Sequence, residues 1–346
     1  MEEELICLVA LARGFVYNCT AARELFERYG SAKGAYDSVK EKLGKESLDA
    51  AGETIDLAHK HGFEIVTIGD SRYPIRLKEC SDAPLILYKK GNCNLNSSRA
   101  ISIVGTRSST EYGKKYCEQI VKHLALCRPG PLIISGMATG IDSCAHRAAL
   151  ENGLNTVAVM GTGFDIVYPP CNQNLSERIC EAGCLLTEFG SGTPSYPYNF
   201  ARRNRIIAGM SDAVVLCESK ARGGGMITAH LAFDYSRSVF AVPGRMDDIS
   251  FNGCNLLIEK QVATIVSCCE VITDTLKWEP AAPADLFSEV SPEKGLILDC
   301  LRQKGEQNLA EIADAVRLPM GEVARLLIEM EIDGQVMHLH SNKYSI

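Results

Sequence analysis

Short, nearly continuous apolar runs alternate with helix-like segments between residues 100 and 242, and this alternation restricts the possible folds more than any other feature. The apolar runs are Ala100–Val104, Leu132–Ser135, Asn155–Met160, Cys184–Thr187, Asp212–Glu218 and Ser238–Val242. The helix-like segments are Tyr112–Cys127, Ile141–Asn152, Asn174–Ala182, Asn204–Gly209 and Met226–Tyr235. Strands that are apolar on both faces lie between two helical layers. The pattern therefore predicts an α/β fold with an extended, Rossmann-like, doubly wound and mostly parallel sheet.

The sequence changes character on both sides of this region. Residues 1–62 form short apolar-periodic segments separated by glycines, which predicts a small N-terminal helical domain with helices at Leu5–Ala12, Ala21–Tyr29, Lys40–Ala51 and Thr54–His61. Strand-like runs at Phe63–Ile68 and Pro84–Tyr88 open the sheet domain, which we place at 63–277.

The C-terminal part begins with a predicted linker at 278–291, which contains Pro280 and Pro283. Residues 292–346 then show three helical segments and a terminal β pair, at Pro292–Lys304, Leu309–Val316, Met320–Ile332, Val336–His340 and Asn342–Ile346. Three helices followed by a hairpin are typical of a winged-helix domain.

Glycines follow several of the predicted strands, at Gly105, Gly136, Gly140, Gly161, Gly163 and Gly223–Gly225. Glycine lets the backbone approach a ligand closely, and a helix N-terminus behind such a loop attracts anions. Because parallel strands end at one edge of the sheet, these loops predict a phosphate-rich ligand there. The alternative is that tight strand-to-helix turns use glycine for steric reasons alone.

Basic and aromatic residues accompany these loops. Arg107, Arg202, Arg203, Arg205 and Arg222 could hold phosphate groups bidentately. We expect Arg202–Arg205 to begin a helix, where arginines oppose the helix dipole and an external anion would explain them; a solvated helix start is the alternative.

Aromatic side chains near the same loops suit the stacking of unpaired bases. The candidates are Phe164, Tyr168, Tyr196, Tyr198 and Phe200. Phe164 directly follows Gly163, so we rank it first, and packing in the core is the alternative for each.

Net charge and cysteine usage exclude other classes of protein. The net charge of −7 excludes a uniformly basic nucleic-acid binder but not a local basic patch. Fifteen cysteines without a Cys-x-x-Cys pair predict reduced, buried thiols and no metal site. An acidic N-terminus and the lack of a long apolar run favour a cytoplasmic protein without membrane contact.

Motifs of common enzymes and cofactor sites are missing. Neither a P-loop nor a Gly-x-Gly-x-x-Gly turn occurs, so we expect neither a P-loop ATPase nor a dinucleotide cofactor. Asp142 and His146, four residues apart on one predicted helix, could be an acid–base pair, but a structural role for Asp142 is the commoner outcome.

Taken in order over residues 63–267, the motifs resemble the DprA/Smf family of bacterial DNA-processing proteins. The matching pieces are Tyr73–Pro74, Pro84–Tyr88, Gly105–Arg107, Tyr112–Gly113, Ser135–Asp142, Ala145–His146, Gly161–Asp165, Tyr168–Pro169, Arg203–Gly209, Ile227–Ala229, Ala241–Gly244, Gly253–Asn255 and Leu257–Ile258.

This resemblance implies a homodimer that binds and protects incoming single-stranded DNA and loads the RecA recombinase onto it in transformation or recombination. The main DNA-gripping arginine of the family falls on Arg107. The implied single-stranded DNA site comprises Gly105, Thr106, Arg107, Ser135, Gly136, Gly140, Gly161, Gly163, Phe164, Arg202, Arg203, Asn204, Arg205, Gly224 and Thr228. The resemblance implies no enzymatic activity and no catalytic residue, and neither a cofactor nor a metal.

The two ends of the chain depart from the family pattern. The first domain of the family often resembles a helix-hairpin-helix module with a Gly-Ile-Gly turn, whereas Arg13–Cys19 contains a single glycine. From Ser291 onward the tail has nine acidic residues against six basic ones. A negative tail reads DNA grooves poorly, so we expect it to contact protein or to regulate.

Two other functions fit the glycine-rich pocket. The segment Arg222–His230 resembles the Pro-Gly-Gly-x-Gly-Thr-x-x-Glu loop of LOG-type phosphoribohydrolases, but Ala229 and His230 stand where the glutamate is needed. A nucleotide sensor that signals through the tail would use the same pocket.

Overall fold

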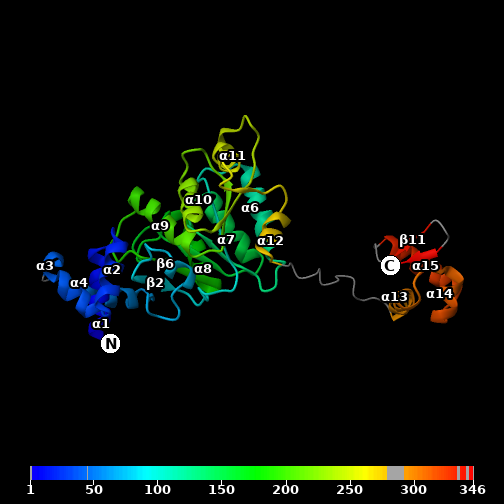
Figure 1. The fold of residues 1–346 in the computed structure, drawn as a ribbon, viewed down its shortest axis with the longest axis horizontal. Coiled ribbons are helices and arrows are strands. Elements are labelled where there is room, and N and C mark those ends of the chain that lie inside the picture. The colour runs from blue at the N-terminus through cyan, green and yellow to red at the C-terminus, as the bar shows by residue number, and fades with distance from the viewer. Residues whose placement is uncertain (1, 45, 279–291, 333–335, 340–342, 346) are drawn as a thin grey trace. The chain divides into compact units, whose positions relative to one another are not determined.

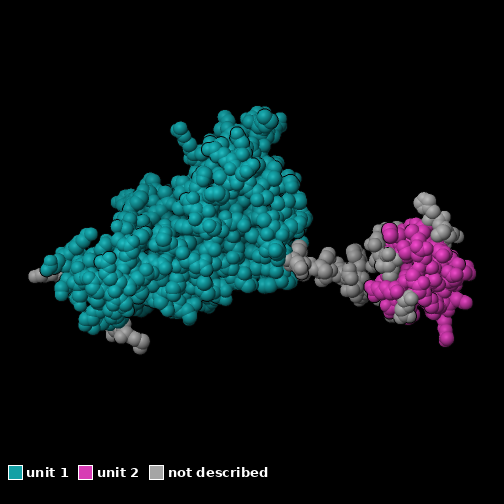
Figure 2. Space-filling model, viewed as in Figure 1, with its two compact units in different colours: residues 1–280 teal, residues 281–346 magenta. Residues whose placement is uncertain are grey.

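The structure is a computed structural model that describes residues 2–44, 46–278, 292–332, 336–339 and 343–345 (Figure 1). The chain divides into two compact units, residues 1–280 and residues 281–346 (Figure 2). Except for Trp278, the predicted linker at 278–291 lies outside the described residues.

The first unit is built on a mostly parallel sheet with the strand order β1-β2-β6-β5-β4-β3-β7-β8-β9. The strands are β1 Glu64–Thr67, β2 Ile86–Lys90, β3 Ala100–Gly105, β4 Leu132–Ser135, β5 Thr156–Val159, β6 Gly183–Thr187, β7 Ala213–Glu218, β8 Ser238–Ala241 and β9 Thr264–Ile265. Only the pairs β1–β2 and β2–β6 are antiparallel. The predicted doubly wound α/β sheet is confirmed, and each predicted strand overlaps an observed one.

Helices lie between these strands along the chain. They are α5 Ile75–Lys78, α6 Glu111–Leu124, α7 Ile141–Glu151, α8 Gln173–Ala182, α9 Pro197–Gly209, α10 Gly224–Asp234, α11 Asn252–Glu259 and α12 Glu270–Leu276, with short 3-10 turns at Pro170–Asn172 and Ile249–Phe251. Helices α6, α7 and α8 pack side by side, and α9 packs against α10. Right-handed crossovers place these two groups on opposite faces of the sheet, so strands such as β7 are buried along their whole length.

The N-terminal helices share one continuous hydrophobic core with the sheet. They are α1 Glu2–Gly14, α2 Cys19–Tyr29, α3 Ala32–Leu43 and α4 Ser47–Lys60. The helix expected over Lys40–Ala51 is wrong, because Gly44 has φ +87° and ends α3 before α4 begins. The boundary expected at residue 62 stays a prediction, and residues 1–280 form one compact unit.

The second unit contains α13 Pro292–Lys304, α14 Leu309–Val316 and α15 Met320–Ile332 with a small sheet in the order β10-β12-β11. Its strands are β10 Gln307–Asn308, β11 Met337–His338 and β12 Lys343–Ser345. A separate core includes Ile312, Val323 and Leu327, and Asn308 caps α14 through a capping box with Glu311. The winged-helix assignment of this unit stays a prediction.

No helix in the described part of the chain combines the length and the hydrophobicity that a bilayer span requires.

Candidate nucleic-acid interface

A cavity of about 470 Å³ opens at the carboxyl edge of the sheet, where the strand order reverses between β3 and β7. From β3 the chain proceeds outward through β4 and β5 to β6, and then returns to β7 on the other side of β3. Neighbouring loops diverge at such a switch point, which makes it the usual ligand site of an open α/β sheet. We call this space the switch-point cavity.

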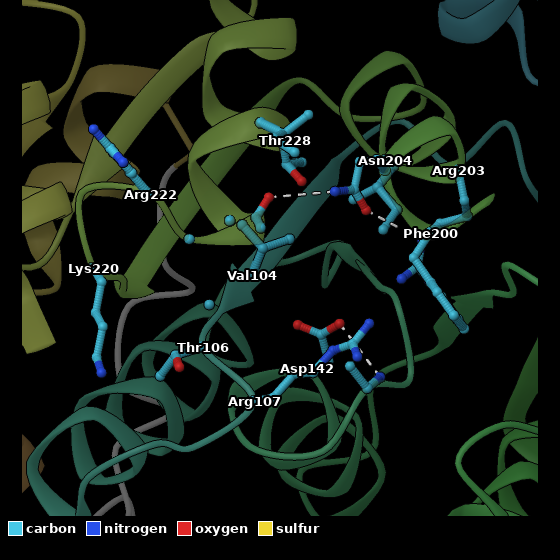
Figure 3. Close-up of a pocket in the computed structure, with 18 of the residues that line it drawn as sticks. Val104, Thr106, Arg107, Asp142, Phe200, Arg203, Asn204, Lys220, Arg222 and Thr228 are labelled. Carbon is cyan, nitrogen blue, oxygen red and sulfur yellow. Dashed lines mark hydrogen bonds between the residues drawn. The ribbon is translucent and has the colours of Figure 1, made fainter. Parts of the chain in front are cut away.

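Four segments line the switch-point cavity (Figure 3): the turn after β3, the start of α7, the first turns of α9 and the loop from β7 to α10. Its lining residues are Val104, Gly105, Thr106, Arg107, Ala138, Asp142, Pro197, Phe200, Ala201, Arg203, Asn204, Ile207, Lys220, Arg222, Gly223, Gly224, Gly225, Ile227 and Thr228. Gly105, Thr106, Arg107, Arg203, Asn204, Gly224 and Thr228 of the predicted site are among them. They come from three separate segments, which are the end of β3 with its turn, helix α9 and helix α10, so the sheet edge brings them together as expected.

The turn that carries Arg107 is held on both sides. The Thr106 amide donates to the Glu218 carbonyl at 2.8 Å, and the Thr106 carbonyl accepts from the Ile141 amide at 3.2 Å. The Glu218 carboxylate accepts from both the amide and the hydroxyl of Thr110, each at 2.9 Å. The turn is therefore fixed between β7 and α7, while the side chain of Arg107 is exposed.

Gly140 makes this close packing possible. Its φ is +79°, and a Cβ there would lie 2.3 Å from the Thr106 carbonyl oxygen. A side chain at this position would be strained and would push the Arg107 turn away.

Positive charge gathers at the rim of the cavity. Arg107, Lys220 and Arg222 are all exposed. The Arg107 guanidinium lies 5.0 Å from the centre of the Phe200 ring. Lys220 and Arg222 lie on one side of the cavity, and Arg203 and Asn204 on the other (Figure 3). An extended anion bound between them would meet cations on both sides.

Arg203 places a buried positive charge in the wall of the cavity. Its side chain is buried and donates to the carbonyl oxygens of Gly136, at 2.6 Å, and of Val159. Burial lowers the pKa of the guanidinium to about 10, and the nearby Asp142 carboxylate opposes that shift. Asn204 continues the wall by donating to the Gly224 carbonyl at 3.3 Å.

The start of α10 offers backbone donors to the same space. Gly223 precedes the helix without a side-chain cap, and Gly224 and Gly225 both line the cavity. A Cβ on Gly225 would lie 2.6 Å from Leu216, so glycine is required for the backbone to sit this close to β7. Uncapped amides at a helix N-terminus are suited to phosphate oxygens.

His146 and Asp142, the possible acid–base pair, both make contacts that stabilise the fold. His146 is fully buried, and its Nδ1 is 2.7 Å from the Thr156 hydroxyl. Burial lowers the pKa of His146 to about 3, with Arg203 and Arg147 adding to the shift. The Asp142 carboxylate accepts from the Ala138 amide at 3.4 Å. Among the described residues, no cluster of three or more His, Cys, Asp or Glu side chains could hold a metal ion.

The remaining glycines of the predicted site support the cavity from behind. Gly136 faces the Arg203 guanidinium, and a Cβ on Gly161 would lie 2.6 Å from the Phe200 ring. Gly163 donates its amide to the Thr193 carbonyl at 2.9 Å. The Ser135 hydroxyl donates to the Ile103 carbonyl at 2.6 Å, inside the sheet.

Phe164 does not reach the cavity. Only 4% of its surface is exposed, and its ring packs 5.5 Å from Phe63 and 4.9 Å from Tyr88. In this structure it therefore has the core role that was the alternative in the sequence analysis. The ring that lies beside the Arg107 guanidinium is that of Phe200, on helix α9.

Arg202 and Arg205 face away from the cavity. Arg205 forms an ion pair with the buried Glu188, and the Arg202 Nε lies 3.5 Å from the other oxygen of that carboxylate. Helix α9 begins at Pro197, not at Asn204 as expected, so these arginines lie inside the helix. The reasoning from a repulsive helix start therefore fails, and an internal carboxylate explains both charges.

Sequence reasoning left Lys220, Arg222, Phe200 and Asp142 out of the expected single-stranded DNA site, although it named Arg222 as a phosphate-binding candidate and Phe200 as a stacking candidate. Lys220 and Arg222 follow β7 in the same way that Arg107 follows β3, and this shared position after a strand was the signal available for them. Phe200 was ranked below Phe164 among the stacking candidates, because its nearness to Arg107 arises only when α9 packs onto the sheet.

Comparison with known proteins agrees with this architecture. Residues 64–277 match the family model of DNA recombination-mediator protein A. The chain is 38% identical to DNA processing protein DprA of Streptococcus pneumoniae over 61% of this chain and 74% of that protein. It is 33% identical to protein Smf of Escherichia coli over 76% of this chain and 72% of that protein.

Two solved structures resemble the first unit. The X-ray structure of DprA from Streptococcus pneumoniae aligns with a TM-score of 0.60 at 36% identity, covering 68% of this chain and 83% of that one. DNA processing protein A of Helicobacter pylori, described with a single-stranded DNA binding mode, aligns with a TM-score of 0.56 at 28% identity, covering 63% and 97%. Since the family model spans well over half of the residues, this chain belongs to the DNA recombination-mediator protein A family, the family of the DprA and Smf proteins.

Proposed function

We propose that this protein binds single-stranded DNA at the switch-point cavity and acts as a recombination mediator. The observation that carries the proposal is the convergence of Arg107, Lys220, Arg222 and the uncapped start of α10 on one open cavity. Membership of the recombination-mediator family and the single-stranded DNA binding of the Helicobacter pylori relative support it.

Each part of the cavity has a role in this proposal. The amides of Gly224 and Gly225 and the Arg107 guanidinium hold phosphate oxygens, and the cations at the rim attract the neighbouring backbone. A base stacks on Phe200, whose ring is partly exposed. Stacking and phosphate contacts do not distinguish sequences, so binding is salt-sensitive and nearly sequence-independent.

Membership of the family supports a proposal for the partners. The protein works as a homodimer in the cytoplasm, protects incoming single strands and loads the RecA recombinase onto them in transformation or recombination. A dimer offers two cavities to one strand, which raises the effective affinity.

The test is fluorescence anisotropy of the full chain with a labelled thymidine oligonucleotide and with a duplex of equal length, each at two salt concentrations. We expect tight binding to the single strand that weakens steeply with salt, and much weaker binding to the duplex. No binding to the single strand at low salt would contradict the proposal.

The phosphoribohydrolase alternative is not favoured. Its essential carboxylate would follow the Gly223–Gly225 loop, where this chain has the buried Ala229 and the exposed His230. The one carboxylate in the cavity lining, Asp142, is buried at the start of α7.

A further inference from the structure

We infer that the N-terminal helices contribute a second base-stacking site, formed by Tyr17 and Tyr198, which lengthens the path of a bound single strand beyond the switch-point cavity. The inference rests on the proposed function, because it assumes that a strand already occupies the cavity. It assigns to the turn between α1 and α2 a direct contact with nucleic acid.

Helix α9 connects the two sites. Its first turns carry Tyr198 and Phe200, and Phe200 lines the switch-point cavity. Residues two positions apart on a helix point about 200° apart, so the two rings lie on opposite sides of α9. On the far side, the Tyr198 ring meets the Tyr17 ring at a centroid distance of 4.8 Å and an angle of 38°. A strand leaving Phe200 therefore reaches the tyrosine pair by crossing one helix end.

Both tyrosines are open to solvent. Tyr17 is 51% exposed and Tyr198 is 50% exposed, although each ring touches the other. Two aromatic rings that pack only to stabilise the fold would usually be covered further, and exposed aromatic pairs are typical of binding surfaces. Since every base has a π-face, such a pair can stack any nucleotide.

A fixed cation lies beneath this pair. The Arg202 guanidinium is 5.8 Å from the centre of the Tyr17 ring. Arg202 also donates to the Cys19 sulfur at 2.9 Å and lies beside the buried Glu188 carboxylate. These contacts immobilise the arginine, so Tyr17 is held in place and loses little entropy when a base stacks on it.

A recess beside Tyr17 supplies polar contacts. The cavity has a volume of about 160 Å³ and is lined by Arg13, Tyr17, Tyr88 and Glu188, among others. Tyr88 is fully buried, and its hydroxyl has no hydrogen-bond partner within the described part of the chain. The volume is roughly five times that of one liquid water molecule, enough for the edge of a planar base but not for a nucleotide chain.

Oligonucleotides of two lengths distinguish binding at this site from binding at the switch-point cavity. Thymidine oligonucleotides of about 4 and about 20 residues are titrated against the full chain by anisotropy at fixed salt. We expect Tyr17→Ala to weaken binding of the long strand about fivefold or more, and to leave the short strand unchanged because it fills only the switch-point cavity. Arg107→Ala weakens both. Tyr29→Ala, another exposed tyrosine of the N-terminal helices at 47% exposure, is the matched control.

Photo-cross-linking locates the contact directly. A long oligonucleotide substituted with 5-iododeoxyuridine is irradiated on the protein, and tryptic peptides are sequenced by mass spectrometry. We expect a cross-link in peptide 14–23, whose only tyrosine is Tyr17.

The outcomes are separable. If the long strand binds the parent and Tyr17→Ala equally well and peptide 14–23 carries no cross-link, the second stacking site is wrong while the proposed function stands. If the parent binds neither strand, the proposed function fails and this inference fails with it. An equal loss with the short strand would place Tyr17 within the first site and also contradict the inference.

Discussion

The two sides of helix α9 use arginine in opposite ways. On the side of the switch-point cavity, Arg107 is exposed, and no carboxylate forms an ion pair with it in the described part of the chain. On the side of the N-terminal helices, Arg202 and Arg205 both contact the buried Glu188. Arginines on the two sides of one helix therefore differ in what they can bind: Arg107 needs an external anion, whereas Arg202 and Arg205 already have an internal one.

The largest expected effect is on the free energy of unfolding, and it comes from mutation of Glu188 on the buried side of α9. Glu188→Gln removes the carboxylate that is shared by two arginines, whose side chains are 14% and 6% exposed, and leaves Arg205 with the Asp82 carboxylate at 4.0 Å. Leaving a buried charge without its partner costs about 3–5 kcal/mol, and we expect the free energy of unfolding to fall by that amount. Chemical denaturation measures it.

Glu79→Gln is the matched control, since Glu79 pairs with Arg237 at the surface and its side chain is 63% exposed. Its removal should cost about 1 kcal/mol or less. Equal losses in the two variants would show that Glu188 is not a buried counter-charge.

The open side should lose binding without losing stability. Arg107→Ala removes a charged donor to phosphate, a contact worth about 1.5–3 kcal/mol, so affinity for single-stranded DNA should fall about 10- to 100-fold. The free energy of unfolding should change by less than about 0.5 kcal/mol. Anisotropy and denaturation on the same preparation test both. Arg178→Ala, an exposed arginine on α8 outside the cavity, should leave both values unchanged.

The stability of the fold should be sensitive to acid through the buried His146. The pKa of the buried His146 is lowered to about 3 from an ordinary 6.5, so between these values the unfolded chain binds a proton that the folded chain does not. Stability therefore falls as the pH drops below about 6.5, by about 2 kcal/mol at pH 5 from this group. Denaturation at pH 7 and pH 5 should show a smaller difference in His146→Gln than in the parent. An unchanged difference would assign the acid sensitivity to other groups.

The smallest effect concerns the rim of the cavity. Lys220→Ala should reduce the slope of log affinity against log salt by about 0.7, as expected for one lost phosphate contact on a single strand. Affinity titrations at four or more salt concentrations measure this slope. Lys115→Ala, an exposed lysine on α6, should leave the slope unchanged. If Lys220→Ala has the same slope as the parent protein, the phosphate contacts lie only on the opposite side of the cavity.

The sheet could be predicted from the sequence because strands such as β4 and β7 are apolar on both faces. Few structures other than a parallel sheet between two helical layers bury short, continuously apolar segments. Local signals were less reliable at helix boundaries. Helix α9 starts seven positions before the expected Asn204, since Pro197 suits a first helical turn and the preceding sequence looked like a loop. That error changed the interpretation of the whole arginine cluster.

Amino-acid sequence by itself determined the order of strands and helices, the glycine turns after β3 and β7, and hence the sheet edge that carries the proposed ligand site. These features depend on residues that are neighbours in the chain. Tertiary structure alone decided which cations face that ligand. Arg203 braces the cavity while Arg202 and Arg205 turn to Glu188, because successive helical residues point about 100° apart and their partners come from distant segments. The same cause buries Phe164 and brings Phe200 to Arg107.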